Sequence, residues 1–289
     1  MPPIIATAGD MVDPLILLLD NGSFRPASTH NLRRLAKELG QASGHTVHPV
    51  SLKHADRITA EELDGRAANI LHSFLIEQLQ LGIRNFLAIP LFFGPSRALS
   101  SFVPDLVESL QSRQGAFKLK LADPLYPLST GEIRLARILR DQIDPLLSLS
   151  PESRVILLDH GSPQPAVTEV RLRIAEELRT MLPSGITFHQ AVMERREGAE
   201  YDFNGELLEK MLDIEAGQRI DIPIVLSMLF ISPGKHAGEG GDIATICSEA
   251  QQRHPGLQVH ISPLVGEHPG LIEILRDRLN KGLSAAQEA

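Results

Sequence analysis

Apolar runs with the length of buried strands alternate along the chain with stretches whose apolar residues recur at helical spacing. Residues 155–159 form one such run, which stops abruptly at His160 and Gly161, and a second run covers residues 224–231. Continuous apolar runs of this length are typical of strands buried on both faces of a parallel sheet. Residues 29–39 carry instead the apolar stripe of an amphipathic helix. The alternation predicts an α/β protein whose parallel sheets are covered by helices on both faces.

The same order of sequence blocks occurs twice in the chain. Residues 15–23 (LILLLDNGS) match residues 154–162 (RVILLDHGS), which sets Asn21 opposite His160. Three further pairs of blocks match in the same order: 89–97 with 227–235, 123–125 with 262–264, and 138–143 with 274–279. In the first of these pairs, Pro95 lies opposite Pro233. Four matched blocks in one order indicate an internal duplication with a period too long for a solenoid repeat.

The duplication predicts two similar domains, residues 1–150 and residues 151–289. Each half contains four strand–helix pairs in series, and right-handed crossovers favour a doubly wound parallel sheet in each. A short polar turn at residues 148–153 (SLSPES) marks the expected boundary. Two units joined this closely are expected to face each other across a shared cleft that can hold a large ligand.

Composition and charge narrow the classes of function. The 289 residues are 43% hydrophobic and 22% charged, which is enough to bury a sizeable core. A net charge of −8 argues against a nucleic-acid partner, because such a partner requires a basic face. The apolar runs are far shorter than the roughly 20 residues that cross a bilayer, and the first residues lack the basic region of a signal peptide. We therefore expect a cytoplasmic protein without membrane contact.

The single cysteine, Cys247, excludes an intrachain disulfide and a cysteine-rich zinc site. Because it lies in a helical pattern, we expect a buried and unreactive thiol. The sequence also lacks a G-x-x-x-x-G-K-[ST] loop, so nothing in it implies nucleotide hydrolysis.

Titratable side chains follow three strands of the second half at the points where those strands are expected to end. They are His160, Glu194 and His236. Ligands of open α/β sheets bind beyond the carboxyl ends of the strands, so these side chains are well placed to converge on one ion. Two imidazoles and a carboxylate suit divalent iron, cobalt, nickel or zinc, and they can equally accept protons near neutral pH.

The first half lacks this set of side chains. It carries Asn21, Lys53 and Ala98 at the matching places. We therefore expect one site per chain, with residues 1–150 as a degenerate domain that serves as scaffold and as the opposite wall for a substrate.

The site residues resemble those of the sirohydrochlorin chelatase family. The resemblance rests on LLDHGS at 157–162, Glu194 after an apolar strand, LFISPGKH at 229–236 and GGDI at 240–243. Members of this family are class II tetrapyrrole chelatases that insert cobalt for cobalamin or ferrous iron for siroheme, and the whole chain is similar in plan to the long, duplicated members. The resemblance implies a lyase that works without ATP or a prosthetic group. Its metal is a substrate, Co²⁺ or Fe²⁺, with Ni²⁺ or Zn²⁺ as alternatives.

The resemblance also implies roles for individual residues. His160 and His236 would bind the metal and abstract the pyrrole protons, and Glu194 would be the neighbouring acidic group that accepts a proton or guides the cation. Which histidine takes which role stays open. The flexible glycines of residues 238–241 would allow the backbone to approach a flat ligand closely.

The substrate would be a polycarboxylate tetrapyrrole, so basic side chains near the cleft are expected at its edge. Ser162, Arg195 and Lys235 are the expected contacts. Further candidates are Arg196 and, on the adjacent helix, Arg171 or Arg173.

Structural interpretations compete with these roles. His160 alone would be an ordinary histidine that donates to a backbone carbonyl, and Glu194 would pair with Arg195 or Arg196 on the surface. The scattered histidines are expected to be solvated or structural: His30, His54, His72, His189, His254, His260 and His268. The pair Glu267 and His268 is a partial exception, because it follows the last strand of the second half.

Two other classes of function remain open. A metal or tetrapyrrole carrier would use His160 and His236 without turnover. An unrelated α/β hydrolase or transferase would need a nucleophile, and Ser162 lacks the G-x-S-x-G elbow. Because one chain already supplies both walls of the cleft, we expect a monomer.

Overall fold

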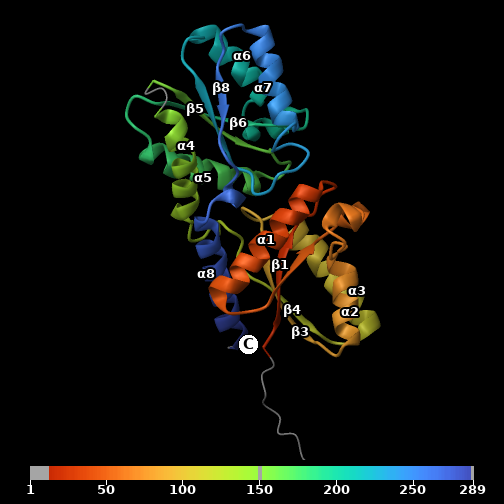
Figure 1. The fold of residues 1–289 in the computed structure, drawn as a ribbon. Coiled ribbons are helices and arrows are strands. Elements are labelled where there is room, and N and C mark those ends of the chain that lie inside the picture. Colours follow the sequence, from red (N-terminus) through yellow and green to blue (C-terminus); the bar gives the residue numbers. More distant parts are fainter. Residues whose placement is uncertain (1–12, 149–151, 288–289) are drawn as a thin grey trace, which may run out of the picture.

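Each half of the chain consists of four strand–helix pairs, as the sequence predicts (Figure 1). The computed structural model describes residues 13–148 and 152–287, so part of the expected boundary at 148–153 lies outside the described residues. The first half comprises β1 (Leu15–Asp20), α1 (Pro26–Ser43), β2 (Val47–Ser51), α2 (Leu71–Gln80), β3 (Asn85–Pro90), α3 (Val103–Gln114), β4 (Lys118–Leu121) and α4 (Ile133–Leu147). The second half comprises β5 (Arg154–Asp159), α5 (Pro165–Met181), β6 (Thr187–Val192), α6 (Leu208–Gln218), β7 (Ile224–Met228), α7 (Asp242–Arg253), β8 (Val259–Ile261) and α8 (Gly270–Gln287).

The two sheets are parallel and have the same topology. Their strand orders are β2-β1-β3-β4 and β6-β5-β7-β8. The central strands are apolar and buried because a neighbour lies on each side and helices lie on each face, as for Leu18 in β1 and Leu157 in β5. Identical order in both halves confirms the predicted α/β fold with two duplicated parallel sheets.

The last helix of each half packs on the sheet of the other half. Helix α4 contacts β7 and α5, whereas α8 contacts α1, β3 and β4. The matched residues of the two helices make matched contacts: Gln142 donates to the carbonyl of Leu264 at 2.7 Å, and Arg278 donates to that of Leu125 at 2.8 Å. Leu18 and Leu157 consequently belong to one continuous core cluster. This exchange of the last helices joins the two halves through one core. The repeat pattern in the sequence does not reveal it.

The helices agree with the expectations from composition. Cys247 is buried in α7, as predicted, and burial raises the pKa of its thiol to about 12. Among the described residues, the helices include none that is long and apolar enough to cross a bilayer.

An aspartate ends the central strand of each half, but its surroundings differ between the halves. Asp20 and Asp159 are both buried, and each accepts a hydrogen bond from the amide two residues further on. Burial raises the pKa of Asp159, although the buried guanidinium of Arg171, which lies 3.7 Å away, opposes that rise. Asp20 has no ion-pair partner in the described parts of the chain, and burial raises its pKa to about 6.

Replacing Asp20 by asparagine is therefore expected to stabilise the fold above pH 6. The folded state holds the proton of Asp20 more tightly than the unfolded chain, so this contribution to stability is lost as the pH rises from about 4 to about 6. Asparagine keeps the acceptor oxygen without the charge. Urea unfolding at pH 7.5 should show a gain of up to about 3 kcal/mol for Asp20→Asn, vanishing near pH 4. Asp159→Asn should give no such gain, because Arg171 would lose its counter-charge.

Candidate metal centre

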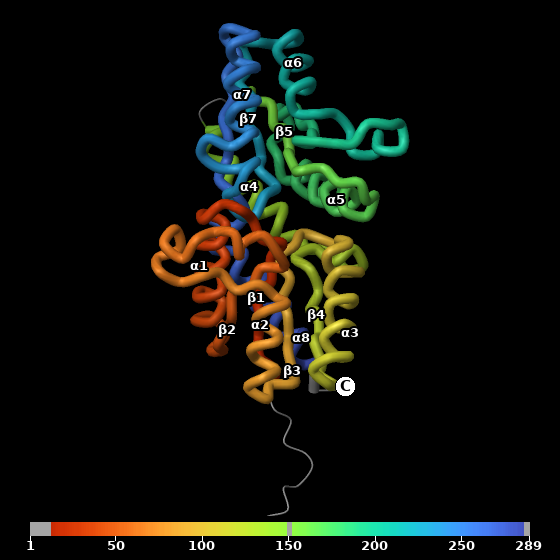
Figure 2. The backbone as a smooth tube through the Cα atoms, turned by 90° about the vertical axis from the view of Figure 1, so that its right-hand side faces the viewer, coloured from red at the N-terminus to blue at the C-terminus, as the bar shows by residue number. Residues whose placement is uncertain are grey.

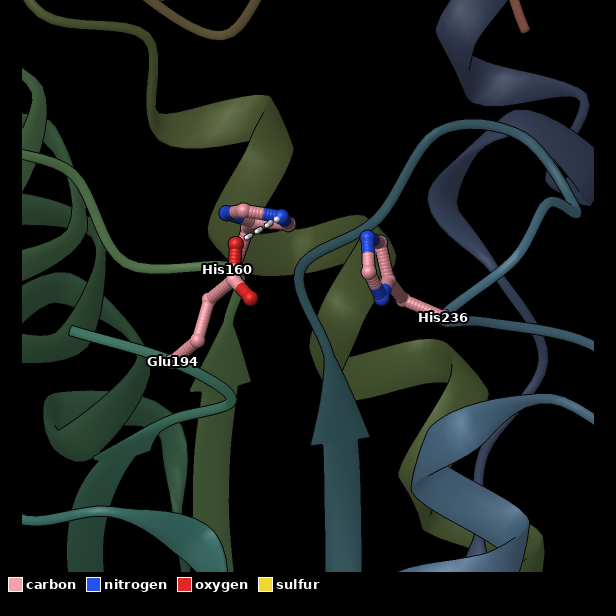
Figure 3. A group of neighbouring side chains, drawn as sticks. All are labelled: His160, Glu194 and His236. Carbon is pink, nitrogen blue, oxygen red and sulfur yellow. Dashed lines mark ion pairs between the residues drawn. The ribbon is translucent and has the colours of Figure 1, made fainter.

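His160, Glu194 and His236 meet at the carboxyl edge of the second sheet. Their ligand atoms all lie within 4.8 Å of one another. His160 Nε2 is 3.1 Å from Glu194 Oε1, and the two imidazole rings are nearly perpendicular, with centroids 4.8 Å apart. Figure 3 shows His160 at the tip of β5, with the Glu194 carboxylate directed towards its ring and His236 facing both from the loop after β7. The structure thus brings together the three side chains that the strand ends place at one edge.

The sequence Asp-His-Gly at the end of β5 fixes the position of Glu194. Gly161 has a φ of +85°, and a Cβ at this position would overlap the carbonyl oxygen of Glu194. The amide of Glu194 donates to the carbonyl of His160 at 3.1 Å. Only glycine allows this close approach of the two loops. The glycine after the histidine is therefore part of the site's construction.

Hydrogen bonds at Nδ1 orient both imidazoles with Nε2 towards the site. His160 Nδ1 donates to the carbonyl of Gly161 at 3.1 Å, and His236 Nδ1 donates to Asp242 Oδ2 at 2.8 Å. A carboxylate behind a histidine fixes the ring tautomer and raises the basicity of the other nitrogen, as in many metal sites. Asp242, the first residue of α7, is thus a positioning residue that sequence reasoning missed. Its place six residues after His236, at a helix start, was the available signal.

The electrostatics of the group favour a bound cation. With Nδ1 of His160 donating, the neutral ring turns the lone pair of Nε2 towards a carboxylate oxygen 3.1 Å away. Two acceptors at this distance repel each other unless a proton or a metal ion lies between them. The side chains of His160, Glu194 and His236 are 45%, 58% and 24% exposed, so an ion can reach them from solvent.

A cavity of about 360 Å³ extends from His160 to the first half of the chain. It is lined mainly by apolar residues of both halves, among them residues 91–94 and 229–231, together with Asn21. Residues 229–231 can line the cavity because β7 ends at Met228, three residues before the end of the apolar run seen in the sequence. Of the three candidate ligands, His160 therefore also lines an apolar space between the two halves.

The expected substrate contacts occupy different surroundings. Ser162, Arg195 and Arg196 line a hollow of about 370 Å³ together with His160 and Glu194. Arg195 also donates to the carbonyl of Gly205 at 2.9 Å. Lys235 lines a separate cavity between the halves and lies 3.7 Å from Asp242. All of these side chains keep exposed surface, so they are free to contact a ligand.

Of the two arginines proposed on α5, Arg171 lines the cavity that contains His160, and Arg173 does not. Arg171 is buried and donates to the carbonyls of Ala191 and Asn204. Arg173 pairs with Glu169 and lines another cavity. The guanidinium groups of both arginines are thus bonded to protein groups.

Four of the remaining histidines contact protein groups away from the metal centre. His30, His189 and His254 each lie within 3.6 Å of a carboxylate away from the metal centre. His268 accepts a hydrogen bond from the amide of Gly270 at the start of α8 and does not line the cavities around His160. Glu194 pairs with His160 and not with the arginines that follow it.

Solved structures with the same fold include several chelatases. SirB from Bacillus subtilis with Fe³⁺ is 12% identical, with a TM-score of 0.71 over 96% of this chain and 98% of that chain. The sirohydrochlorin chelatase SirB from Bacillus subtilis subspecies spizizenii in complex with cobalt is 13% identical, with a TM-score of 0.66 over the same shares. CbiX, described as the terminal enzyme of siroheme biosynthesis in denitrifying bacteria, is 16% identical, with a TM-score of 0.56 over 92% of this chain and 98% of that one.

These likenesses define the chain as a two-domain protein with the fold of the class II chelatases. Residues 154–282, the part of the chain that carries the three candidate ligands, match the family model CbiX. No curated protein sequence matches the chain. The resemblance to sirohydrochlorin chelatases that the sequence motifs indicate is thus confirmed.

Proposed function

We propose that this protein is a chelatase that inserts Co²⁺ or Fe²⁺ into sirohydrochlorin or a related precorrin. The observation that carries the proposal is the convergence of His160, Glu194 and His236 at the carboxyl edge of the second sheet, where His160 also lines an apolar cavity between the two halves. An apolar space suits a flat macrocycle, and the three ligands suit a divalent transition metal. The match of residues 154–282 to the CbiX family model supports the same function.

Metal insertion makes three demands, and the side chains at this site can meet each of them. The metal must be held beside the macrocycle, two pyrrole protons must leave, and water and protein ligands must be exchanged for four ring nitrogens. Three partly exposed ligands leave coordination positions open, so the ion can be passed on. An imidazole that releases the metal becomes free to accept a pyrrole proton, and Glu194 can accept the second.

The division of labour follows from the duplication. We propose that residues 151–289 carry the chemistry and that residues 1–150 form the scaffold and the opposite wall. Ser162, Arg195 and Lys235 would contact the substrate from the catalytic half. Because one chain supplies both walls of the cavity, the active form would be a monomer in the cytoplasm. The reaction would need neither ATP nor a prosthetic group.

Spectroscopy of the reaction tests the function directly. Protein is mixed anaerobically with sirohydrochlorin and Co²⁺ or Fe²⁺, and the change of the absorption spectrum is followed over time. Many turnovers at a rate above that of the protein-free mixture are expected with at least one metal. A single stoichiometric spectral change without turnover would instead identify a carrier. Comparing the two metals in the same assay also establishes which one is preferred.

A further inference from the structure

The first half carries a charge-reversed counterpart of the metal centre. A Cβ on Gly22 would overlap the carbonyl oxygen of Lys53, just as one on Gly161 would overlap that of Glu194. Lys53 therefore occupies in the first half the position that Glu194 occupies in the second. The matching position thus carries a carboxylate in the second half and a cation in the first.

Exposed aromatic rings surround this position. Phe24 and Phe102 are 54% and 42% exposed, unusually high for residues of this kind. The ring of Phe24 lies 4.7 Å from that of His54 and 5.4 Å from the guanidinium of Arg57. Lys53 Nζ lies 6.0 Å from the ring of Phe102. We call these five residues the aromatic–cationic surface.

The cations of the aromatic–cationic surface are not neutralised by the protein. Within the part of the chain that the structure describes, neither Lys53 nor Arg57 has an ion-pair partner, although the whole chain has a net charge of −8. Arg195 and Lys235, in contrast, lie near Asp202 and Asp242. Between Lys53 and Arg57 the sequence contains one carboxylate, that of Asp56, and this residue is exposed. Unpaired cations beside exposed ring faces suit a ligand that is both flat and anionic.

Two chain segments that carry this surface also contribute residues to the cavity that contains His160. Asn21 and Ser96 line the cavity together with His160. Phe24 follows Asn21 by three residues, and Phe102 ends the helical segment that begins two residues after Ser96. The two halves lie one above the other in Figure 2, and the cavity lies between their strand ends. A ligand that extends out of the cavity along these two segments would reach the aromatic–cationic surface.

We propose that the aromatic–cationic surface binds the carboxylate-bearing edge of a planar tetrapyrrole and presents its ring to the metal ligands. The proposal rests on the chelatase function and adds to it a recognition site on the half that has lost the metal ligands. Lys53 and Arg57 pair with carboxylates at the edge, and Phe24 and Phe102 contact the ring face. The degenerate half thereby determines which tetrapyrroles bind.

Titration of the full-length protein with metal-free sirohydrochlorin tests the proposal. Lys53→Ala and Arg57→Ala are each expected to raise Kd by about tenfold, because each removes a charge-assisted contact. Lys37→Ala removes an exposed cation elsewhere on the first half and should leave Kd unchanged. Co²⁺ binding without tetrapyrrole should be the same in all these proteins. In the metallation assay the double variant should show a higher KM with most of kcat retained.

The fully esterified tetrapyrrole provides a second arm of the experiment. Wild-type protein should bind the ester more weakly than the free acid, and the two substitutions should then have no further effect. If wild type metallates sirohydrochlorin but the double variant binds it as tightly as Lys37→Ala does, the aromatic–cationic surface is not a substrate site and the chelatase function stands. If wild type binds sirohydrochlorin in a Lys53-dependent manner without metallating it, the surface stands and the chelatase function does not.

Discussion

Replacing His160 or His236 by alanine is expected to lower the rate of metallation by about 100-fold or more, whereas Asn21→Ala should leave most of the rate intact. Each histidine supplies one of three converging ligands and one of the available proton acceptors. Asn21 holds the matching position in the first half, but its amide neither accepts a proton near neutral pH nor binds a transition metal strongly. The measurement is the initial rate of metallosirohydrochlorin formation at saturating metal.

Direct metal binding separates loss of the site from loss of the fold. Both histidine variants should bind Co²⁺ more weakly in isothermal titration, while their circular dichroism spectra and urea midpoints should match those of wild type, because the two rings are partly exposed. The opposite ranking, with Asn21→Ala inactive and His160→Ala active, would show that the first half carries the chemistry. That result would overturn the division of labour between the halves.

The convergence of the site follows from the sequence because buried parallel strands leave an unambiguous signal. An apolar run that ends at a polar residue marks the carboxyl end of a strand, and neighbouring ends meet at one edge. His160 and Glu194 follow β5 and β6 directly, so their closeness could be predicted without coordinates. His236 lies eight residues beyond β7, and its orientation depends on the loop and on Asp242. The direction of a side chain in such a loop is not encoded in a local pattern.

The exchange of α4 and α8 was also beyond the reach of pattern reasoning. An amphipathic helix has the same apolar stripe whichever sheet it covers, so the repeat alone suggests two self-contained units. Gln142 and Arg278 settle the arrangement, since each reaches a carbonyl of the other half. The aromatic–cationic surface was hidden for a related reason. A lone lysine or arginine in a sequence is usually solvated, and only the structure shows Lys53 and Arg57 beside exposed rings.

The two matched glycines allow the construction of the metal centre to be separated from the stability of the fold. Gly161→Ala and Gly22→Ala place a Cβ against equivalent carbonyl oxygens, at φ values of +85° and +81°. Both substitutions should therefore lower the free energy of unfolding by a similar amount, about 1–3 kcal/mol in urea titrations. Only Gly161→Ala displaces the loop that carries Glu194, so only this variant should bind Co²⁺ about tenfold or more weakly.

Measuring Co²⁺ affinity at a temperature where both glycine variants are fully folded makes the comparison decisive. In Gly22→Ala the displaced residue is Lys53, which binds no metal, so its Co²⁺ affinity should equal that of wild type while its tetrapyrrole affinity falls. Equal loss of Co²⁺ affinity in both variants would mean that general loosening of the fold, and not the position of Glu194, controls the metal. If Gly161→Ala weakens Co²⁺ binding and Gly22→Ala weakens tetrapyrrole binding, the matched glycine turns have different roles. The turn in the second half then positions a metal ligand, and the turn in the first half positions a substrate contact.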